Sequence, residues 1–570
     1  MISVSGKKWS ERKIDNKLVE KLSQNKNFSE ILSRLVISRN FNDEEIYSIN
    51  NELELNNVFK LNKDYQQSVN LVLNSILNKE KICILGDYDV DGSVATSLLV
   101  SFFKNIDHPY FFYIPNREKD GYGASVNLFK ELIKKDPKLI IMVDCGSNSI
   151  ESINYLNKNK IKSLIIDHHQ INKPFPLANS IINPKKNNGY IQYDYLCSAT
   201  LTYFFLDLLV KKFFDKKLLI NFNIKDYLIY VLLATVCDVM PLRKLNRIIA
   251  INALRKIDIN KNKILNKIYE IAGKNNKITI NDLGYFIGPI LNSGGRLGKS
   301  NYATQLLSSN NQKDISFIAN KLVKLNDKRK NIESKILENI NFHELEKENK
   351  NIIVIYNKNF NEGLIGIIAA RLKEYFNKPC IIITKSNNLL KGSARSIPSF
   401  DIGVAIKNSL DNNILINGGG HKMAAGFTLL EDNLTEFTTF IEKQFLKLGL
   451  PDESNLFVYD SKISSSAFNK IFYNEINKLF PFGTANIEPY FFFEKLKILK
   501  SKIVKKNNIS SFLKSKSGYS IQSISFNSVN SKIGEYLLNY KKEINVIGQI
   551  KENFWKNKKT LQLTIKDLIT

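Results

Sequence analysis

The sequence predicts a multidomain α/β protein with a β-barrel near its C-terminal end. Short apolar runs alternate with helical segments between residues 80 and 170, which indicates a parallel sheet covered by helices on both faces. A second α/β pattern begins at residue 351, and residues 449–570 contain many short strand-like runs that are typical of a small barrel. A chain of 570 residues is also too long for a single hydrophobic core.

We expect five consecutive segments along the chain. Residues 1–75 show polar amphipathic helical patterns, and residues 314–345 continue a charged amphipathic pattern without proline or glycine. The predicted bounds are 1–60 for an N-terminal helical segment, 61–310 for the first α/β domain, 311–348 for a connecting helix, 349–448 for the second α/β domain, and 449–570 for an OB-like barrel suited to single-stranded nucleic acid.

The composition favours a folded protein with a polyanionic partner. The net charge is +27, which is large enough to attract nucleic acid over a distance. Lys, Asn and Ile dominate the sequence, as in proteins from AT-rich genomes, and we attribute about half of the excess charge to this bias. Charge alone therefore does not establish nucleic-acid binding.

The cysteines and apolar runs predict a cytoplasmic protein. The five cysteines form no CxxC pair and lie mostly in apolar surroundings, as expected for reduced thiols. The first 15 residues lack the apolar core of a signal peptide. The longest apolar stretch, 227–237, is shorter than the roughly 20 residues that span a bilayer. We expect no membrane segment.

The most informative motif is GDYDVDGS at 86–93, which directly follows the apolar run 81–85. Its carboxylates Asp87, Asp89 and Asp91 repel one another, and a hard divalent cation is the simplest compensation. On an extended chain Asp89 and Asp91 would face opposite ways. We expect a turn at Gly92 to let both reach inward.

Three further clusters supply ligands of the same kind. Asp144 follows the apolar run 139–143, and His168 and His169 follow the run 163–166. Asp238 ends a helical-looking apolar segment. Because ligands bind beyond the carboxyl ends of parallel strands, we expect these side chains to meet in one phosphoryl-hydrolysing metal site. Any single Asp here could instead be a helix N-cap or turn residue, and for Asp144 or Asp238 taken alone we would favour that interpretation.

The second α/β domain contains two motifs suited to phosphate. GSARS at 392–396 places Ser393 and Arg395 two residues apart, so on a strand both point to the same side and can grip a phosphate. A surface salt bridge is the alternative for Arg395. The glycines before His421, in GGGH at 418–421, let backbone amides approach an anion closely, or form a plain helix-entry turn.

The motifs DYDVDG, DCGS, DHH and CDVMPL, in this order, resemble those of the DHH phosphoesterase superfamily. NSGGRLG at 292–298, GSARS, GGGHKMAAG at 418–426 and the terminal barrel extend the resemblance to RecJ-type exonucleases. It covers about residues 50–570 and implies a DHH domain, a DHHA1-type domain and an OB-like barrel. Departures are Ile166 before DHH, ATVCD for the commoner GTVAD, and NSGGR for NAAGR.

The resemblance also implies roles for individual residues. The implied metal ligands are Asp89, Asp91, Asp144, His168 and Asp238. Asp87 and His169 lie in the same motifs and are candidate catalytic residues, with His169 contacting substrate or acting as an acid. The implied substrate-binding residues are Arg117, Tyr122, Arg296, Ser393, Arg395 and His421, with Ser393 and Arg395 holding a 5′-terminal phosphate.

The implied activity is a two-metal 5′→3′ exonuclease that degrades single-stranded DNA to 5′-mononucleotides in DNA repair and recombination. Two Mn²⁺ ions are the implied cofactors, since an imidazole ligand suits Mn²⁺ better than Mg²⁺. Mg²⁺ is the alternative. We expect a monomer, with a helicase or a single-strand-binding protein as candidate partners. The alternative functions are a phosphoesterase acting on oligonucleotides or cyclic dinucleotides, and a non-catalytic DNA-binding scaffold.

Overall fold

The computed structural model describes residues 3–116, 120, 123–186, 188–218, 220–274, 277–386, 388–448, 456–540, 542–555 and 558–570. The chain forms two compact units. One comprises residues 54–449, and the other joins residues 1–53 to residues 450–570. Within the described residues, no helix is both long and apolar enough to cross a membrane.

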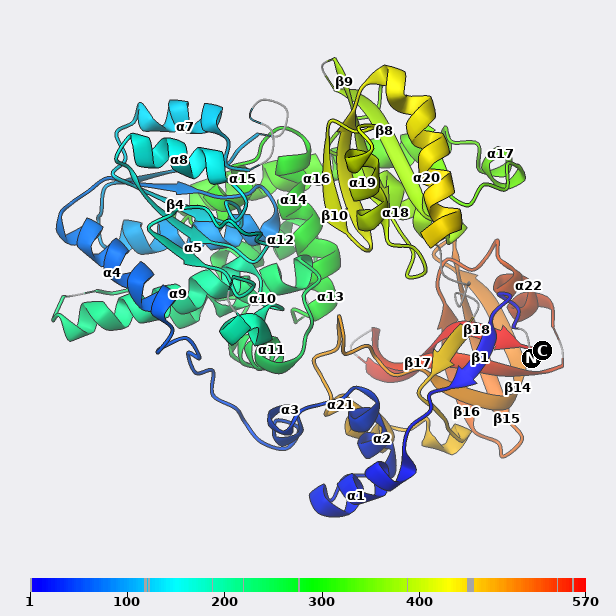
Figure 1. Cartoon of the computed structure of the whole chain (residues 1–570). Coiled ribbons are helices and arrows are strands. Elements are labelled where there is room, and N and C mark those ends of the chain that lie inside the picture. Colours follow the sequence, from blue (N-terminus) through cyan, green and yellow to red (C-terminus); the bar gives the residue numbers. More distant parts are fainter. Residues whose placement is uncertain are drawn as a thin grey trace. The chain divides into compact units, whose positions relative to one another are not determined.

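The predicted DHH domain is built on a parallel sheet of five strands in the order β3-β2-β4-β5-β6. Figure 1 labels its strand β4 and several of the helices around the sheet. The strands are β2 (Ile82–Leu85), β3 (Tyr110–Tyr113), β4 (Leu139–Val143), β5 (Lys162–Ile166) and β6 (Ser180–Ile182). The first four coincide with the predicted apolar runs, and all residues of β2 and β4 are buried. The short strand β6 was not predicted.

Helices cover both faces of this sheet, as predicted. Helices α7 (Val126–Ile133) and α8 (Ile150–Lys158) share one apolar core with the sheet. Helices α4 (Lys63–Leu77), α5 (Val90–Asn105) and α9 (Ser198–Asp215) pack against the other face and one another. Helix α5 is buried over most of its length because α9 and further helices cover it.

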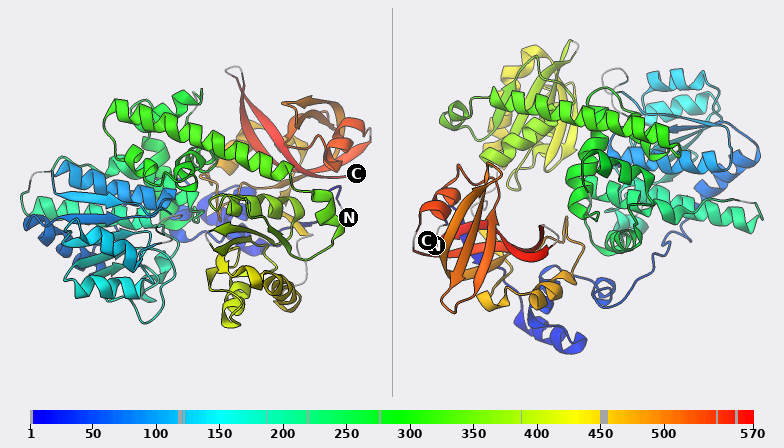
Figure 2. Two further views of the ribbon diagram at one scale, coloured as in Figure 1. Left: turned by 90° about the horizontal axis from the view of Figure 1, so that it is seen from above. Right: turned by 180° about the vertical axis from the view of Figure 1, so that it is seen from behind.

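A series of helices completes the domain. They are α10 (Leu228–Cys237), α11 (Lys244–Lys256), α12 (Lys263–Ile271), α13 (Ile280–Asp282), α14 (Gly288–Arg296) and α15 (Tyr302–Leu307). The long helix α16 (Gln312–Glu338), bright green in Figure 2, follows at the expected place. The expected single helix is interrupted after Glu338, because Asn341 accepts a hydrogen bond from the Glu344 amide and starts α17 (Phe342–Lys347).

The second α/β domain has a mixed sheet in the order β10-β11-β9-β8-β7. Its strands are β7 (Ile353–Tyr356), β8 (Cys380–Ser386), β9 (Leu389–Arg395), β10 (Asn417–His421) and β11 (Ala424–Leu429). Helix α18 (Ile365–Phe376) packs on one face, and α19 (Ile402–Asp411) and α20 (Leu434–Leu448) pack on the other. Of the two interpretations of GGGH, the helix-entry turn is wrong, because these residues pair along β11 as strand β10.

An ion network joins α16 to the second α/β domain. The guanidinium of Arg329 donates to Glu333 at 2.9 Å, and Arg371 of α18 donates to the other oxygen of Glu333 at 2.9 Å. Arg329 and Glu333 are buried, so their charges need these partners. The connecting helix is therefore joined to α18 of the domain that follows it.

The C-terminal barrel is closed, as expected for an OB-type fold. Its strands run in the order β14-β15-β16-β18-β17, and pairing of β17 with β14 closes the ring. They are β14 (Phe491–Val504), β15 (Asn508–Ser515), β16 (Ser520–Ser525), β17 (Glu543–Trp555) and β18 (Lys558–Ile569), with β13 (Ser461–Lys462) added beside β14. Helices α21 (Lys470–Asn477) and α22 (Lys532–Asn539) contribute to its core.

The N-terminal segment belongs to the barrel unit. Helices α1 (Asn16–Lys26), α2 (Glu30–Ser38) and α3 (Asp43–Tyr47) add apolar residues to the barrel core. The segment is not purely helical, which corrects the prediction, because β1 (Lys8–Glu11) pairs with β12 (Leu456–Tyr459). The buried carboxylate of Asp567 accepts hydrogen bonds from the Ser5 hydroxyl and the Trp9 indole, which fixes this segment to β18.

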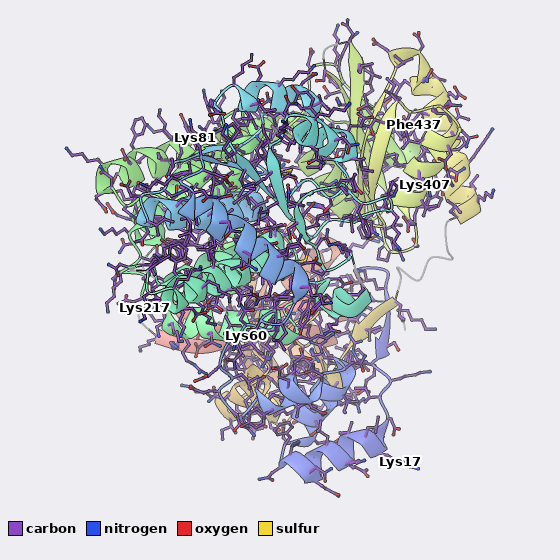
Figure 3. The ribbon with its side chains drawn as sticks, turned by 60° about the vertical axis from the view of Figure 1, so that its left-hand side comes forward. Lys17, Lys60, Lys81, Lys217, Lys407 and Phe437 are labelled. Carbon is purple, nitrogen blue, oxygen red and sulfur yellow. The ribbon has the colours of Figure 1, made fainter. Side chains whose placement is uncertain are left out.

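The positive charge is spread over the surface of the chain. The labelled lysines of Figure 3, from Lys17 in α1 to Lys407 in α19, are all exposed. Phe437, by contrast, is fully buried in the core of the second α/β domain. These exposed lysines come from both units of the chain.

Candidate active site: an acidic metal centre

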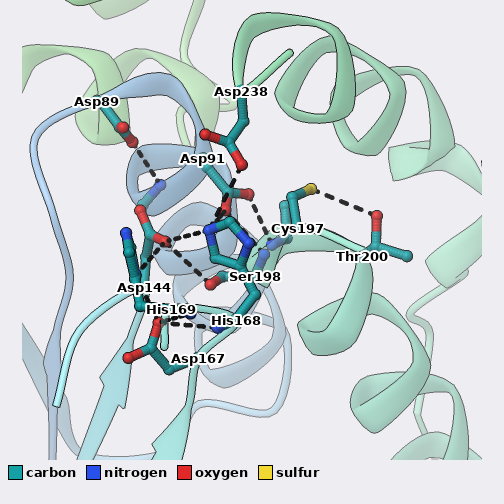
Figure 4. A network of polar contacts seen from close by, with 12 residues as sticks. Asp89, Asp91, Asp144, Asp167, His168, His169, Cys197, Ser198, Thr200 and Asp238 are labelled. Atoms are coloured by element: carbon teal, nitrogen blue, oxygen red, sulfur yellow. Dashed lines mark hydrogen bonds and ion pairs between the residues drawn. The ribbon is translucent and has the colours of Figure 1, made fainter. Parts of the chain in front are cut away.

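The predicted acidic clusters meet at one edge of the DHH sheet. The chain leaves β2 for β3 on one side and later enters β4 on the other side, so the strand order reverses at β2. Ligands bind at such a reversal, beyond the carboxyl ends of the strands. Asp87, Asp89 and Asp91 follow β2, Asp144 follows β4, and His168 follows β5 (Figure 4).

Helix α5 starts inside the first motif. Asp89 is its N-cap, and the Asp89 carboxylate accepts a hydrogen bond of 3.0 Å from the Gly92 amide. Asp91 lies in the first helical turn and is buried. The expected turn at Gly92 is absent, because Gly92 is helical. It is needed for space, since a Cβ there would lie 2.6–2.8 Å from backbone atoms of Asp87.

Two residues at the site have left-handed backbones. Asp144 has φ 61°, which is uncommon for a residue other than glycine. Val239 directly follows Asp238 at the end of α10 and has φ 57°, although its side chain is β-branched. Backbone strain of this kind collects at functional sites, where the surrounding structure holds it in place.

His168 lies between three of the predicted carboxylate ligands (Figure 4). Its Nε2 is 3.4 Å from Asp238 Oδ2, 3.5 Å from Asp144 Oδ1 and 3.8 Å from Asp91 Oδ2. Ligand atoms within 4.8 Å of one another form three overlapping groups. The groups are Asp91 with His168 and Asp238, Asp87 with Asp89 and Asp144, and Asp144 with His168 and His169.

Unpartnered polar atoms show that this cluster fits a metal. Among the described residues, Nδ1 of His168 and Oδ2 of Asp238 are buried and make no hydrogen bond. Such atoms are costly in a folded protein unless a ligand satisfies them. Carboxylates with one imidazole form a donor set that suits Mn²⁺ and Mg²⁺. All five predicted metal ligands lie in this cluster, and their role as ligands stays a prediction.

The N-terminus of α9 supports two of the carboxylates. The amides of Ser198 and Ala199 donate to the two oxygens of Asp91 at 2.7 and 2.8 Å. The Ser198 hydroxyl donates to Asp144 Oδ1 at 3.0 Å. Sequence analysis missed Ser198, because a serine in an apolar segment carries no signal that separates it from an ordinary buried hydroxyl.

Asp167 and Lys185 are also functional candidates that sequence analysis missed. The Asp167 carboxylate accepts hydrogen bonds from the His168 and His169 amides and lies 2.8 Å from His169 Nδ1, so it fixes the His169 ring. The ammonium of Lys185 donates to the His168 carbonyl at 2.7 Å. The signal for Asp167 was present, since it is the first residue of DHH.

Burial and mutual repulsion make three carboxylates of the metal-free cluster, Asp91, Asp144 and Asp238, bind protons more readily than usual. Burial, and then the charge of Asp89, raise the pKa of Asp91 to about 6, although two amides of α9 oppose the rise. Burial and the charges of Asp91 and Asp89 raise the pKa of Asp238 to about 8. Burial and the charge of Asp91 hold the pKa of Asp144 well above its usual range. A divalent cation would displace these protons.

The two histidines have opposite protonation states. Burial, with the charge of His169, lowers the pKa of His168 to about 3, so this ring is the neutral form that binds metals. Burial alone would lower the pKa of His169, but the hydrogen bond and charge of Asp167 outweigh it and raise the pKa to about 9. The His169 ring is therefore an imidazolium at neutral pH.

Ser393 and Arg395 form a cradle in the second α/β domain. They alternate along β9 and share one face, and a guanidinium nitrogen of Arg395 donates to the Ser393 hydroxyl at 3.3 Å. A Cβ at Gly366 would lie 3.1 Å from both side chains, so the first turn of α18 faces them. No side chain caps α18, and helix N-termini attract phosphate. The position of Gly366 beside these two side chains was not predicted from the sequence.

Arg296 contacts the second α/β domain, and His421 of that domain lies near enough to the acidic cluster to affect it. Arg296 ends α14, and its guanidinium donates to the carbonyl of Gly363, just before α18, at 3.2 Å. His421 ends β10, and its charge contributes to the lowered pKa of His168. Both predicted residues therefore lie near the acidic cluster or the cradle. Arg117 and Tyr122 lie outside the described residues.

Three family models match the chain. The DHH family N-terminal domain matches residues 81–235, the DHHA1 domain matches 349–447, and the RecJ OB domain matches 459–567. These matches agree with the observed sheet, second α/β domain and closed barrel. The predicted fold class is confirmed.

Known proteins match over nearly the whole chain. The single-stranded-DNA-specific exonuclease RecJ of Haemophilus influenzae is 31% identical over 509 residues, covering 84% of this chain and 87% of the relative. RecJ of Bacillus subtilis is 26% identical, and the match covers 98% of this chain and 70% of the relative. The crystal structure of RecJ from Thermus thermophilus in complex with Mn²⁺ has a TM-score of 0.82 at 20% identity. The match covers 99% of this chain and 79% of the chain in that structure. The chain belongs to the RecJ family of DHH proteins.

Proposed function

We propose that this chain hydrolyses single-stranded DNA from its 5′ end and releases 5′-mononucleotides with the help of two divalent ions. It is a single-stranded-DNA-specific exonuclease, as its curated relatives are named, and it depends on a divalent metal. The polarity, the product, the number of ions and a preference for Mn²⁺ are our proposals.

The acidic cluster would hold the ions. Asp91, His168 and Asp238 form one set, and Asp87, Asp89 and Asp144 form another. We assign Asp144 as the shared ligand, because it lies 3.5 Å from His168 as well as in the second set. When bound, such ions polarise the phosphoryl group and supply an activated water.

His169 is our candidate for the proton donor to the leaving oxygen. Asp167 holds its Nδ1 at 2.8 Å, so Nε2 is the atom left to face a substrate. The raised pKa of about 9 keeps a proton on this ring at neutral pH. Asp167 acts through His169 by fixing its tautomer and orientation. Asp87 would assist as a carboxylate of the second set.

The cradle supports the proposed polarity. Ser393, Arg395 and the first turn of α18 offer a hydroxyl, a guanidinium and backbone amides, which together suit a terminal phosphate. Arg296 contacts the loop before α18 and would contact a phosphate between the cradle and the metal centre. A 5′ phosphate held in the cradle would place the next phosphodiester at the acidic cluster.

A polymer substrate is favoured over a dinucleotide by the closed barrel. OB-type barrels track single strands through basic grooves and aromatic stacking. Phe512 on β15 and Phe554 on β17 are exposed aromatic side chains that suit this contact. Roles in DNA repair and recombination, and partners such as a helicase or a single-strand-binding protein, fit such a substrate. Comparing cleavage of dinucleotides with that of long strands separates the alternatives.

The observation that carries this proposal is the convergence of carboxylates from β2, β4 and α10 on His168. The test is a product time course on single strands labelled at the 5′ or the 3′ end, with Mn²⁺ and with chelator. We expect immediate release of labelled mononucleotide from the 5′ label, a slowly shortening 3′-labelled strand, and no reaction with chelator. Immediate release of the 3′ label would contradict the polarity.

A further inference from the structure

We propose that Ser198 is a positioning residue that fixes Asp144 and thereby sets the affinity of the site for its divalent ions. This inference rests on the proposed metal role of Asp144. Ser198 is fully buried, and it contacts carboxylates that reach the site from two different strands. Its hydroxyl donates to Asp144 and its amide donates to Asp91.

The two carboxylates depend on Ser198 to different degrees. Asp91 accepts hydrogen bonds from the amides of Ser198 and Ala199, and both amides persist whatever the side chain at 198. Among the described residues, the hydroxyl of Ser198 supplies the hydrogen bond that Asp144 Oδ1 accepts. Removing this hydroxyl therefore changes the support of Asp144 and leaves that of Asp91 intact.

The Ser198 hydroxyl lies nearer to Asp144 Oδ1 than either histidine ring does. The backbone of Asp144 is left-handed, and Oδ1 lies 3.5 Å from His168 Nε2 and 3.8 Å from His169 Nδ1. Without the hydroxyl, the carboxylate can rotate toward either ring. With the hydroxyl, Oδ1 accepts a hydrogen bond of 3.0 Å that holds the carboxylate in one orientation.

Groups that orient metal ligands typically change metal affinity by about 10- to 100-fold when they are removed. We therefore expect Ser198→Ala to weaken Mn²⁺ binding within this range. Nuclease activity should fall at limiting Mn²⁺ and recover at saturating Mn²⁺. A hydroxyl that only fills space would instead lower stability without changing the dependence on Mn²⁺.

The experiment measures Mn²⁺ binding by isothermal titration calorimetry and free Mn²⁺ by electron paramagnetic resonance. Thr202→Ala is the matched control, since Thr202 lies one turn further along α9, is fully buried, and donates its hydroxyl to the Ser198 carbonyl. We expect wild-type affinity in this control. Ser198→Gly is a second truncation and should match Ser198→Ala.

Wild-type Mn²⁺ affinity in the folded Ser198→Ala and Ser198→Gly proteins would overturn the inference. An equal loss of affinity in Thr202→Ala would do the same, because it would show a general effect of α9. The binding measurement does not require turnover. A wild-type protein that binds Mn²⁺ without cleaving single strands would therefore count against the proposed function and leave the role of Ser198 open to the same test.

Discussion

The two α/β domains place opposite chemistry at comparable positions. Five carboxylates from the ends of the DHH strands and of α10 lie near one neutral imidazole, whereas the carboxyl end of β9 presents a hydroxyl and a guanidinium beside a helix N-terminus. The first arrangement crowds like charges together, which raises the pKa values of Asp91 and Asp238. The second is already paired within the protein, because Arg395 donates to Ser393 and to the Ala394 carbonyl.

This difference indicates that ion binding depends on the acidic cluster and not on the cradle. The acidic cluster should respond strongly to metal, pH and single charge removal. The cradle should respond mainly to the chemistry of the DNA end. The following variants and conditions should affect the acidic cluster and the cradle differently. Equal effects on both would show that the two sites behave alike.

The largest effect is expected for Asp144→Asn, because this change removes the charge of the proposed shared ligand. We expect the turnover rate to fall by about three orders of magnitude, with single-strand binding retained. Asp207→Asn on α9, which removes a charge paired with Lys211, is the control and should keep full turnover. Substantial turnover by Asp144→Asn would show that the cluster is not the reaction centre.

The next effect is expected at the cradle. Charge-assisted hydrogen bonds are worth roughly 1.5–3 kcal/mol, so Arg395→Ala should reduce the preference for 5′-phosphorylated over 5′-hydroxyl ends by about 10- to 100-fold. Lys391→Ala is the control, since Lys391 lies on the same strand and face and bonds to Thr428. An unchanged ratio in Arg395→Ala would place the terminal phosphate elsewhere.

The stabilisation of the folded protein by bound Mn²⁺ should increase with pH. The pKa values of Asp91 and Asp238 are raised to about 6 and about 8, so between about pH 4 and pH 8 the metal-free folded state binds more protons than the unfolded state. Its stability therefore falls as pH rises through this range, while Mn²⁺ competes better with fewer protons. The Mn²⁺-induced rise in Tm should be larger at pH 8 than at pH 6, and a constant rise would contradict the raised pKa values.

The smallest effect concerns strain beside the metal centre. Val239 is 65% exposed and left-handed, so Val239→Gly should remove backbone strain at little cost in packing and raise the free energy of unfolding by about 1 kcal/mol. Lys160→Gly, at the left-handed position after α8, is the comparison and should gain less, because lysine is not β-branched. Chemical denaturation measures both, and a loss of stability in Val239→Gly would show that the valine packs favourably.

Sequence reasoning found the parts of the site that depend on local pattern. Apolar runs located β2 to β5, and parallel pairing then placed their acidic ends at one edge. The contacts between residues far apart in the sequence were not predicted. Ser198 reaches Asp144 over 54 positions, and β1 pairs with β12 near residue 456. GGGH was left open between an anion-binding motif and a helix-entry turn, and pairing with β11 makes it a strand.

The most direct test of the central claim is the number of Mn²⁺ ions bound per chain, measured by calorimetry on wild type and on Asp144→Asn. If carboxylates from separate strands share ions through Asp144, wild type should bind two ions tightly and the variant should lose tight binding at one site or both. Equal binding by the two proteins, or no tight binding by wild type, would contradict the claim.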